Sequence, residues 1–450
     1  MKDFTLAEIA KACNGEYVGD ESLKNTKITS VERDSRQVKN GSLFLAIKGE
    51  RVDGHDFIEK CFAQGAVCAL CEKAPENATK PCIVVSSTLD AVKKIGKAYR
   101  EKFDIPVIGI SGSVGKTSTK EMLYAVLSQK FKTHKTQGNL NNELGVPLTL
   151  LSMPEDTEAA VIEMGISDFG EMTRLSEMVQ PTICVLTIIG ECHLENLGDR
   201  DGVLKAKTEM FKNARENAYF ILNGDDDKLS TVKTVNGKKP VFFGLDAKND
   251  FYAKNIKNSG DGKVLATLCF DNNNIDVEIP AIGTYMVTNA LAAAAAGKLL
   301  GLTDEEIANG VASYKTVGSR ANVIDTGKIK IIDDCYNANP TSVRASLDTL
   351  SNLDGRKVAI LGDMKELGSE ELKLHFDTGV YAKSKDIGTV ITVGELAKEL
   401  AKGADGKAFD TIEDAKPEIL KTIKSGDVVL VKASHSMQFE NIVEFLKQNF

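Results

Sequence analysis

A glycine-rich turn ending in Gly-Lys-Thr stands between an apolar run and a helical pattern in VIGISGSVGKTSTKEML, residues 107–123. Glycines at 112 and 115 can adopt positive φ, so the backbone can fold around an anion while the N–H groups of the next helix point at it. Lys116 would place a cation on the β- and γ-phosphates of a nucleotide. A merely tight turn is the alternative, because Gly109 stands one residue too early for the usual P-loop pattern. The predicted phosphate loop comprises Gly112, Ser113, Val114, Gly115, Lys116, Thr117 and Ser118.

A nucleotide triphosphate site also needs Mg²⁺, which prefers oxygen ligands in octahedral geometry. The Thr117 hydroxyl is one candidate ligand, and Glu163, which ends the apolar run AAVI, is a second. His193 follows another apolar run, in HLENLG. A surface carboxylate and an ordinary loop histidine are the alternatives for the last two. In LKAKTEMFKN, the ordinary interpretation of Lys205 and Lys207 is a solvated basic helix face.

The scaffold for these residues is predicted to be an α/β fold of three domains. Residues 1–103 mix short strands and helices in a small α/β domain. Residues 104–315 contain buried apolar strands, each followed by a helical pattern, which indicates a parallel sheet covered on both faces. An antiparallel pair within 267–283 and an alanine-rich helix from Thr288 would complete this central P-loop domain. Residues 316–450 predict a C-terminal Rossmann-like domain with ligands at the carboxyl ends of its strands.

Composition narrows the function classes. The chain has 450 residues, 42% hydrophobic and 27% charged, and a formal net charge of -8, which argues against wholesale binding of nucleic acid. The acidic start MKDFTLAEIAKACNGEY shows no targeting segment, and no apolar run is long enough to span a bilayer. We therefore expect a cytoplasmic protein without membrane insertion.

The nine cysteines are expected to be reduced thiols. CALC, with Cys61 and Cys82 nearby, can be drawn as a zinc site. We favour a buried strand instead, because Cys68 and Cys71 would then point to opposite faces of the sheet.

Several motifs in order, GISGSVGKTS, TQGNLNNELGVPLTLL, VIEMG, HLENLG and AKTEMF, resemble the Mur ligase family of ATP-dependent, amide-forming enzymes of peptidoglycan precursor synthesis. The family's P-loop has the same displaced first glycine. DDCYNANPTS and DSRQVKNGSLFLAIKGERVDGHDF are similar to the member that joins UDP-N-acetylmuramoyl-tripeptide to D-alanyl-D-alanine. The resemblance spans all three predicted domains and implies a cytoplasmic, monomeric enzyme that forms an acyl phosphate from ATP.

The resemblance also implies roles for single residues. Lys116 and Arg320 would contact phosphates, Thr117 and Glu163 would bind one Mg²⁺ and His193 a second, and Lys207 matches a carbamylated lysine. A carbamate would replace a cation that repels Mg²⁺ with oxygens that bind or orient around it. The further implied contacts are Asn289, Asp334, Asn337 and Asn339 with the nucleotide, Ser35, Arg36 and Lys48 with the uridine nucleotide, and Asn141 and Asn142 with the UDP-sugar.

The chain departs from the family pattern in places. Tyr285 and Met286 replace a usual His-Asn pair, Ser167 and Asp168 stand where Asn-His is common, and His435 stands where arginine is frequent. Two alternatives stay open at this stage. One is another Mur-type ligase that adds a single amino acid, and the other is a P-loop kinase or nucleotide-dependent switch, which would not need Lys207. The residue at the third position of the tripeptide, lysine or diaminopimelate, is not specified by any motif.

Overall fold

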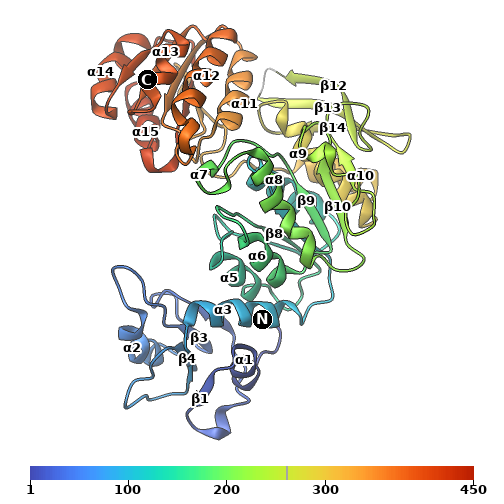
Figure 1. Ribbon diagram of the computed structural model, residues 1–450, viewed down its shortest axis with the longest axis vertical. Coiled ribbons are helices and arrows are strands. Elements are labelled where there is room, and N and C mark those ends of the chain that lie inside the picture. The colour runs from blue at the N-terminus through green and yellow to red at the C-terminus, as the bar shows by residue number, and fades with distance from the viewer. Residues whose placement is uncertain (260–261) are drawn as a thin grey trace.

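The computed structural model describes residues 1–259 and 262–450. Figure 1 shows three parts along the long axis, with the N-terminal region in blue, the central region in cyan to yellow and the C-terminal region in orange and red. We use these names for residues 1–103, 104–315 and 316–450. Within the described residues, none of the helices has the length and apolar character needed to cross a membrane.

The N-terminal region is a five-stranded sheet in the order β1-β5-β4-β3-β2, with β1 antiparallel to β5 and the other neighbours parallel. Cys68 and Cys71 lie on opposite faces of β4, in two different hydrophobic clusters, as the alternation predicts. All nine cysteines are buried free thiols. Its elements are α1 (Leu6–Cys13), β1 (Glu16–Val18), β2 (Ser30–Glu32), β3 (Ser42–Leu45), α2 (Ile58–Ala63), β4 (Cys68–Cys71), β5 (Cys82–Val84) and α3 (Thr88–Arg100).

The central region contains a six-stranded, entirely parallel sheet in the order β11-β10-β9-β6-β8-β7. The apolar runs at β6, β8 and β9 are buried along their full length, as expected for strands covered on both faces. Its elements are β6 (Val107–Ser111), α4 (Lys116–Leu127), β7 (Thr133–Lys135), α5 (Gly145–Leu151), β8 (Ala159–Glu163), α6 (Glu171–Val179), β9 (Ile183–Leu186), α7 (Leu194–Leu197), α8 (Arg200–Thr208), β10 (Tyr219–Asn223) and β11 (Val241–Phe243).

A small antiparallel sheet and two helices complete this region. The expected antiparallel pair is present as β13 and β14, and β12 adds a third strand. The alanine-rich helix α9 is buried and packs with α4 in one hydrophobic cluster. These elements are β12 (Tyr252–Ser259), β13 (Lys263–Phe270), β14 (Asn273–Ile279), α9 (Tyr285–Leu299) and α10 (Asp304–Ala312).

The C-terminal region is a six-stranded sheet in the order β15-β16-β20-β17-β18-β19, parallel except at the β15–β16 edge. Helices cover both faces and enclose two separate hydrophobic clusters. The elements are β15 (Asn322–Asp325), β16 (Lys330–Asp333), α11 (Pro340–Ser351), β17 (Arg356–Gly362), α12 (Glu371–Ser384), β18 (Thr389–Val393), α13 (Ala397–Ala404), β19 (Lys407–Phe409), α14 (Ile412–Thr422), β20 (Asp427–Lys432) and α15 (Glu440–Asn449).

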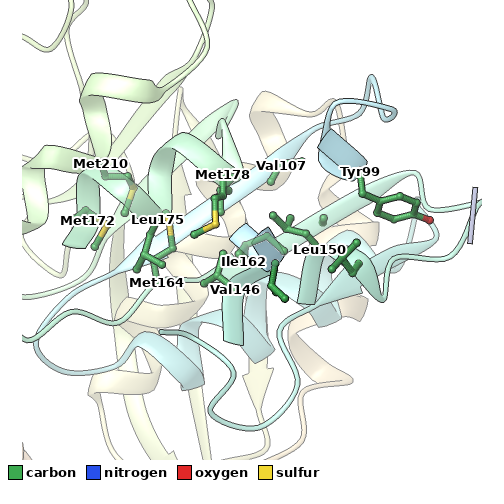
Figure 2. Packing of buried hydrophobic residues seen from close by; sticks show 14 of the residues in the cluster. Tyr99, Val107, Val146, Leu150, Ile162, Met164, Met172, Leu175, Met178 and Met210 are labelled. Atoms are coloured by element: carbon green, nitrogen blue, oxygen red, sulfur yellow. The ribbon is translucent and has the colours of Figure 1, made fainter. Parts of the chain in front are cut away.

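One continuous hydrophobic cluster joins the N-terminal and central regions. Figure 2 shows Tyr99 of α3 in this packing beside Leu150 of α5, together with Ile162 and several methionines of the central region. A Cβ at Gly96 would lie 2.7 Å from the Pro147 Cβ, so glycine permits the close approach of α3 to α5. These two regions therefore share a core, whereas the C-terminal region has cores of its own.

A buried arginine reinforces this junction. The Arg100 guanidinium, at the end of α3, donates to the carbonyl oxygens of Val179 at 2.9 Å, Phe103 at 2.7 Å and Gln180 at 3.3 Å. Arg100 is fully buried, and burial lowers its pKa to about 10. Its hydrogen bonds tie the end of α3 to the end of α6 at the chain's passage into the central region.

Candidate active site

The phosphate loop is a preformed turn between β6 and α4. Gly115 is the residue before α4, with φ +84°, in the left-handed region that favours glycine. A Cβ at Gly112 would lie 1.9 Å from the Thr187 Oγ1, so a larger residue cannot fit there. Ser113 donates its N–H to the Ile188 carbonyl at 2.7 Å, which holds the loop on the end of β9. The Lys116 Nζ donates to the Gly112 carbonyl at 2.8 Å, and the ammonium therefore lies folded over the turn.

The predicted pair Thr117 and Glu163 is brought together because β8 lies beside β6 in the sheet. The Thr117 hydroxyl donates to the Glu163 carboxylate, with oxygen distances of 3.2 and 3.0 Å. The Asn141 Nδ2 donates to the same carboxylate at 2.8 Å. Glu163 is only 2% exposed, so this carboxylate lies in a buried polar cluster next to the phosphate loop.

Lys120 is a member of this cluster that sequence reasoning missed. Its Nζ lies 3.6 Å from the Glu163 Oε2 and 3.2 Å from the Glu121 Oε1, and the side chain is 1% exposed. Lys135 forms a second ion pair with Glu121. The available signal was a lysine one helical turn after Lys116 on a helix whose other positions are largely apolar.

His193 and Lys207 lie in the electrostatic field of the phosphate loop. Burial lowers the pKa of Lys207 to about 8, and the Lys116 cation lowers it further, whereas Cys192 opposes these effects. Burial also lowers the pKa of His193 to about 4, with the Lys207 and Lys116 cations adding to the effect. The expectation of a solvated basic face holds for the exposed Lys205 and is wrong for Lys207, which is 1% exposed. In residues 1–259 and 262–450, the Lys207 ammonium has no hydrogen-bond or ion-pair partner.

The C-terminal region presents its predicted nucleotide residues around the carboxyl end of β16. The Asp334 carboxylate accepts from the Lys432 Nζ at 2.6 Å and from the Ser346 Oγ at 2.7 Å. Asn339 caps α11 by accepting the Ser342 N–H at 2.8 Å, and the Asn337 side chain accepts the N–H of residue 338. These hydrogen bonds therefore stabilise the loop between β16 and α11, which carries the predicted nucleotide residues.

The predicted uridine-nucleotide residues lie on loops after two parallel strands, β2 and β3. The Arg36 guanidinium is exposed and hydrogen-bonded to Asp34, and this contact lowers the pKa of the Asp34 carboxyl to about 2. Ser35 lies in the same turn, and Lys48 forms a backbone bridge with Asp53. These basic groups form an accessible edge on the N-terminal region.

Comparisons with known proteins identify the family that has this architecture. Residues 27–111 match the Mur ligase family catalytic domain, 110–297 the Mur ligase middle domain, and 319–435 the Mur ligase glutamate ligase domain. The UDP-N-acetylmuramoyl-tripeptide--D-alanyl-D-alanine ligase of Bacillus subtilis is 37% identical, over 98% of this chain and 98% of its own length. The chain belongs to the Mur ligase family.

Solved Mur ligases have the same fold as this one. A crystal structure of MurF from Acinetobacter baumannii has a TM-score of 0.92 and 32% identity, covering 100% of this chain and 99% of the other. A crystal structure of MurF ligase from Thermotoga maritima in complex with ADP has a TM-score of 0.84 and 30% identity, covering 93% of this chain and 97% of the other.

The remaining predicted residues of this Mur ligase have structural partners. The Asn289 Oδ1 accepts from the Thr119 Oγ1 at 2.9 Å, which joins α9 to α4 behind the phosphate loop. The Asn142 Oδ1 accepts the Gly145 N–H at 2.8 Å at the start of α5. These contacts position the loop segments around the site.

The donor set beside the phosphate loop suits a hard cation. Thr117 and Glu163 offer hydroxyl and carboxylate oxygens, which are the ligand types Mg²⁺ prefers. In the described part of the chain, this site included, no group of three or more histidine, cysteine, aspartate or glutamate side chains is arranged to hold a metal. A cation here would therefore share few protein ligands with substrate phosphates, which is the usual mode for Mg²⁺.

Proposed function

We propose that this protein is the ligase that joins UDP-N-acetylmuramoyl-tripeptide to D-alanyl-D-alanine, with ATP converted to ADP and phosphate. The product is the UDP-N-acetylmuramoyl-pentapeptide used in peptidoglycan synthesis. The observation that carries the proposal is the 37% identity with the Bacillus subtilis relative of that name across 98% of both chains. The protein is thus an ATP-dependent ligase that forms a C–N bond, and the alternative of a single-amino-acid ligase or a P-loop switch is disfavoured.

The reaction follows from the chemistry of a carboxylate, which is a poor electrophile. Transfer of the γ-phosphoryl group from ATP to the tripeptide carboxylate makes an acyl phosphate and releases ADP. The dipeptide amine then attacks the acyl carbon, and the tetrahedral intermediate collapses with loss of phosphate. Lys116 is folded over the phosphate loop and Arg320 lies in the segment joining the central and C-terminal regions, so both cations can offset phosphoryl charge.

Metal binding is the next part of the proposal. Thr117 and Glu163 would hold one Mg²⁺ through hydroxyl and carboxylate oxygens, which suit a hard cation, and His193, in the field of the Lys116 cation, would contribute an imidazole nitrogen to a second. Bound Mg²⁺ neutralises phosphate charge during phosphoryl transfer. The chain itself contributes orientation, since Asn141 and Lys120 hold the Glu163 carboxylate in place.

Carbamylation of Lys207 is supported by its surroundings. A lysine ammonium must first lose one proton, and attack of the neutral amine on CO₂ then forms the N–C bond and releases a second proton, which leaves an anionic N-carboxylate. Burial lowers the pKa of Lys207 to about 8, so the neutral amine is accessible near neutral pH. The new anion would lie in the field of the Lys116 cation, where negative charge is favourable.

Substrate binding is proposed to be divided among the three regions, taken as functional domains 1–103, 104–315 and 316–450. The accessible basic edge with Ser35, Arg36 and Lys48 suits a uridine diphosphate. Asn141 and Asn142 would lie near the sugar between that edge and the phosphate loop. The nucleotide residues proposed are Asn289, Arg320, Asp334, Asn337 and Asn339, and we expect a monomer.

The test is phosphate release by the purified protein with ATP, Mg²⁺ and UDP-N-acetylmuramoyl-tripeptide. Parallel reactions receive D-alanyl-D-alanine, D-alanine or a diamino acid. Release that requires both the tripeptide and the dipeptide supports the proposal. Release that ignores the dipeptide, or that a single amino acid stimulates with a shorter acceptor, would contradict it.

A further inference from the structure

A carboxylate of the C-terminal region contacts the histidine of the central region. The His193 Nδ1 lies 2.5 Å from the Glu366 Oε2, and the Leu194 N–H donates to the Glu366 carbonyl at 3.0 Å. Glu366 lies in the loop that follows β17, far from His193 in the sequence. Both residues have positive φ, +51° for His193 and +64° for Glu366, which non-glycine residues rarely adopt. Such backbone strain is maintained where the surroundings over-determine the conformation.

The loop that carries Glu366 is anchored on both sides. The Met364 N–H donates to the buried His375 Nε2 at 2.9 Å, and the Lys365 N–H donates to the Ser434 Oγ at 2.9 Å. Leu367 is 1% exposed, and a Cβ at Gly368 would lie 3.2 Å from the Glu195 backbone. The carboxylate is therefore presented to His193 by a fixed support.

The contact with Glu366 occupies one nitrogen of the His193 ring and leaves the other for a further partner. The Glu366 carboxylate lies against the Nδ1 side of the ring as a close ion-pair contact, and an ionised carboxylate can only accept a proton from that nitrogen. In the chain as described, 1–259 and 262–450, no hydrogen bond or ion pair engages the Nε2. Histidines that bind metals usually donate their other N–H to a carboxylate or carbonyl, which fixes the ring orientation.

We propose that Glu366 is a positioning residue that orients the His193 ring so that its Nε2 faces the second cation. The inference rests on the proposed function, because that cation is part of it. Its consequence is that the cation site is complete only while the C-terminal region is docked on residues 190–194. A second interdomain hydrogen bond, from the Thr341 Oγ1 to the Glu191 Oε2 at 2.5 Å, supports the same docking.

The test counts bound Mn²⁺ by electron paramagnetic resonance in the presence of a non-hydrolysable ATP analogue and UDP-N-acetylmuramoyl-tripeptide. Nitrogen modulation of the Mn²⁺ echo reports coordination by the His193 ring, and a merely structural residue would not change this signal. The variants are Glu366→Gln, which removes the charge at constant shape, and Glu366→Ala. The matched control is Glu370→Gln, because Glu370 lies in the same loop and pairs with Lys373 at its exposed surface.

We expect two ions in the wild type, one with nitrogen modulation. Glu366→Ala should weaken the nitrogen-coupled ion roughly 10- to 100-fold, Glu366→Gln should weaken it less, and the other ion should be unaffected. Equal affinity and equal modulation in wild type and both Glu366 variants would overturn the inference and leave the proposed function intact. A wild type without a nitrogen-coupled ion would instead overturn the assignment of His193 itself, and the inference with it.

Discussion

The guanidinium carbon of Arg320 lies 3.6 Å from the centre of the Tyr336 ring. The His435 ring lies next to the Tyr336 ring, with their centroids 5.9 Å apart and their planes at an angle of 31°. The Tyr336 N–H also donates to the Ser319 carbonyl at 3.1 Å, which ties the segment before β15 to the loop after β16. Tyr336 therefore fixes the position of the Arg320 guanidinium, which we propose contacts the phosphates.

Replacement of Tyr336 by leucine should lower kcat/KM for ATP about tenfold, because a cation over an aromatic face gains roughly 0.5 to 2 kcal/mol. Tyr336→Phe keeps the ring face and should stay close to wild type. Steady-state kinetics with varied ATP measure both variants. Equal losses in the two variants would assign the effect to the hydroxyl and not to the stack.

Lys207→Ala should reduce ligase activity roughly 100-fold or more, since the buried amine that we propose reacts with CO₂ would be gone. Wild-type activity should fall in buffer purged of CO₂ and recover on addition of bicarbonate, whereas the variant should not respond. Lys205→Ala is the matched control, because Lys205 is exposed on the same helix. Full activity of Lys207→Ala would favour a P-loop enzyme of another kind.

Lys120→Met should lower the free energy of unfolding by about 3 kcal/mol or more, because it leaves the buried Glu163 carboxylate without a counter-ion and leaves Glu121 with Lys135 alone. The affected groups are Glu163 and Glu121, both largely buried. Urea unfolding measures the change. Lys132→Met, which breaks an exposed pair with Asp156, should cost less than about 1 kcal/mol. Similar losses in the two variants would contradict the buried-network interpretation.

How far the sequence predicts this molecule depends on whether a feature is local. The phosphate loop and the parallel strands follow from contiguous patterns, and Asn339 before Pro340 is a typical helix start. The burial of Lys207 and Lys120 depends on elements packed from elsewhere, so helical periodicity alone assigns such lysines to a solvated face. The contact of His193 with Glu366 joins two regions of the chain and has no local signal.

Arg100→Met should lower the free energy of unfolding by about 3 kcal/mol, because it leaves buried carbonyl oxygens without donors. Chemical denaturation with far-UV circular dichroism gives the value. Lys97→Met is the control on the same helix, since Lys97 pairs with Glu177 at the exposed surface, and its cost should be under about 1 kcal/mol. A smaller loss for Arg100→Met than for the control would refute this view of the junction.

His375 should make the protein less stable in mild acid. Burial, with a smaller contribution from the Lys365 cation, lowers its folded-state pKa, while the Glu371 carbonyl and the Asp363 and Glu371 carboxylates oppose the shift. Above about pH 6.5 the ring is neutral in both the folded and the unfolded protein. Below that pH the unfolded protein binds the proton first, so the free energy of unfolding decreases as the pH decreases. Urea unfolding between about pH 7.5 and pH 5.5 measures the slope.

In the variant His375→Gln, the free energy of unfolding should depend less steeply on pH. His134 and His193, whose pKa values are also lowered by burial, should retain their share. An unchanged slope in His375→Gln would show that His375 does not titrate in the unfolding equilibrium.

The core shared by the N-terminal and central regions has a mechanical consequence. Where two regions share one packed interior, the edge bearing Arg36 and the loop bearing Lys116 keep a constant separation. The C-terminal region is built around two further clusters, one of which also takes in Ile282 of the central region, and it contacts residues 190–194 through polar groups. The contacts that complete the catalytic centre are therefore made across the boundary between this shared core and the C-terminal region.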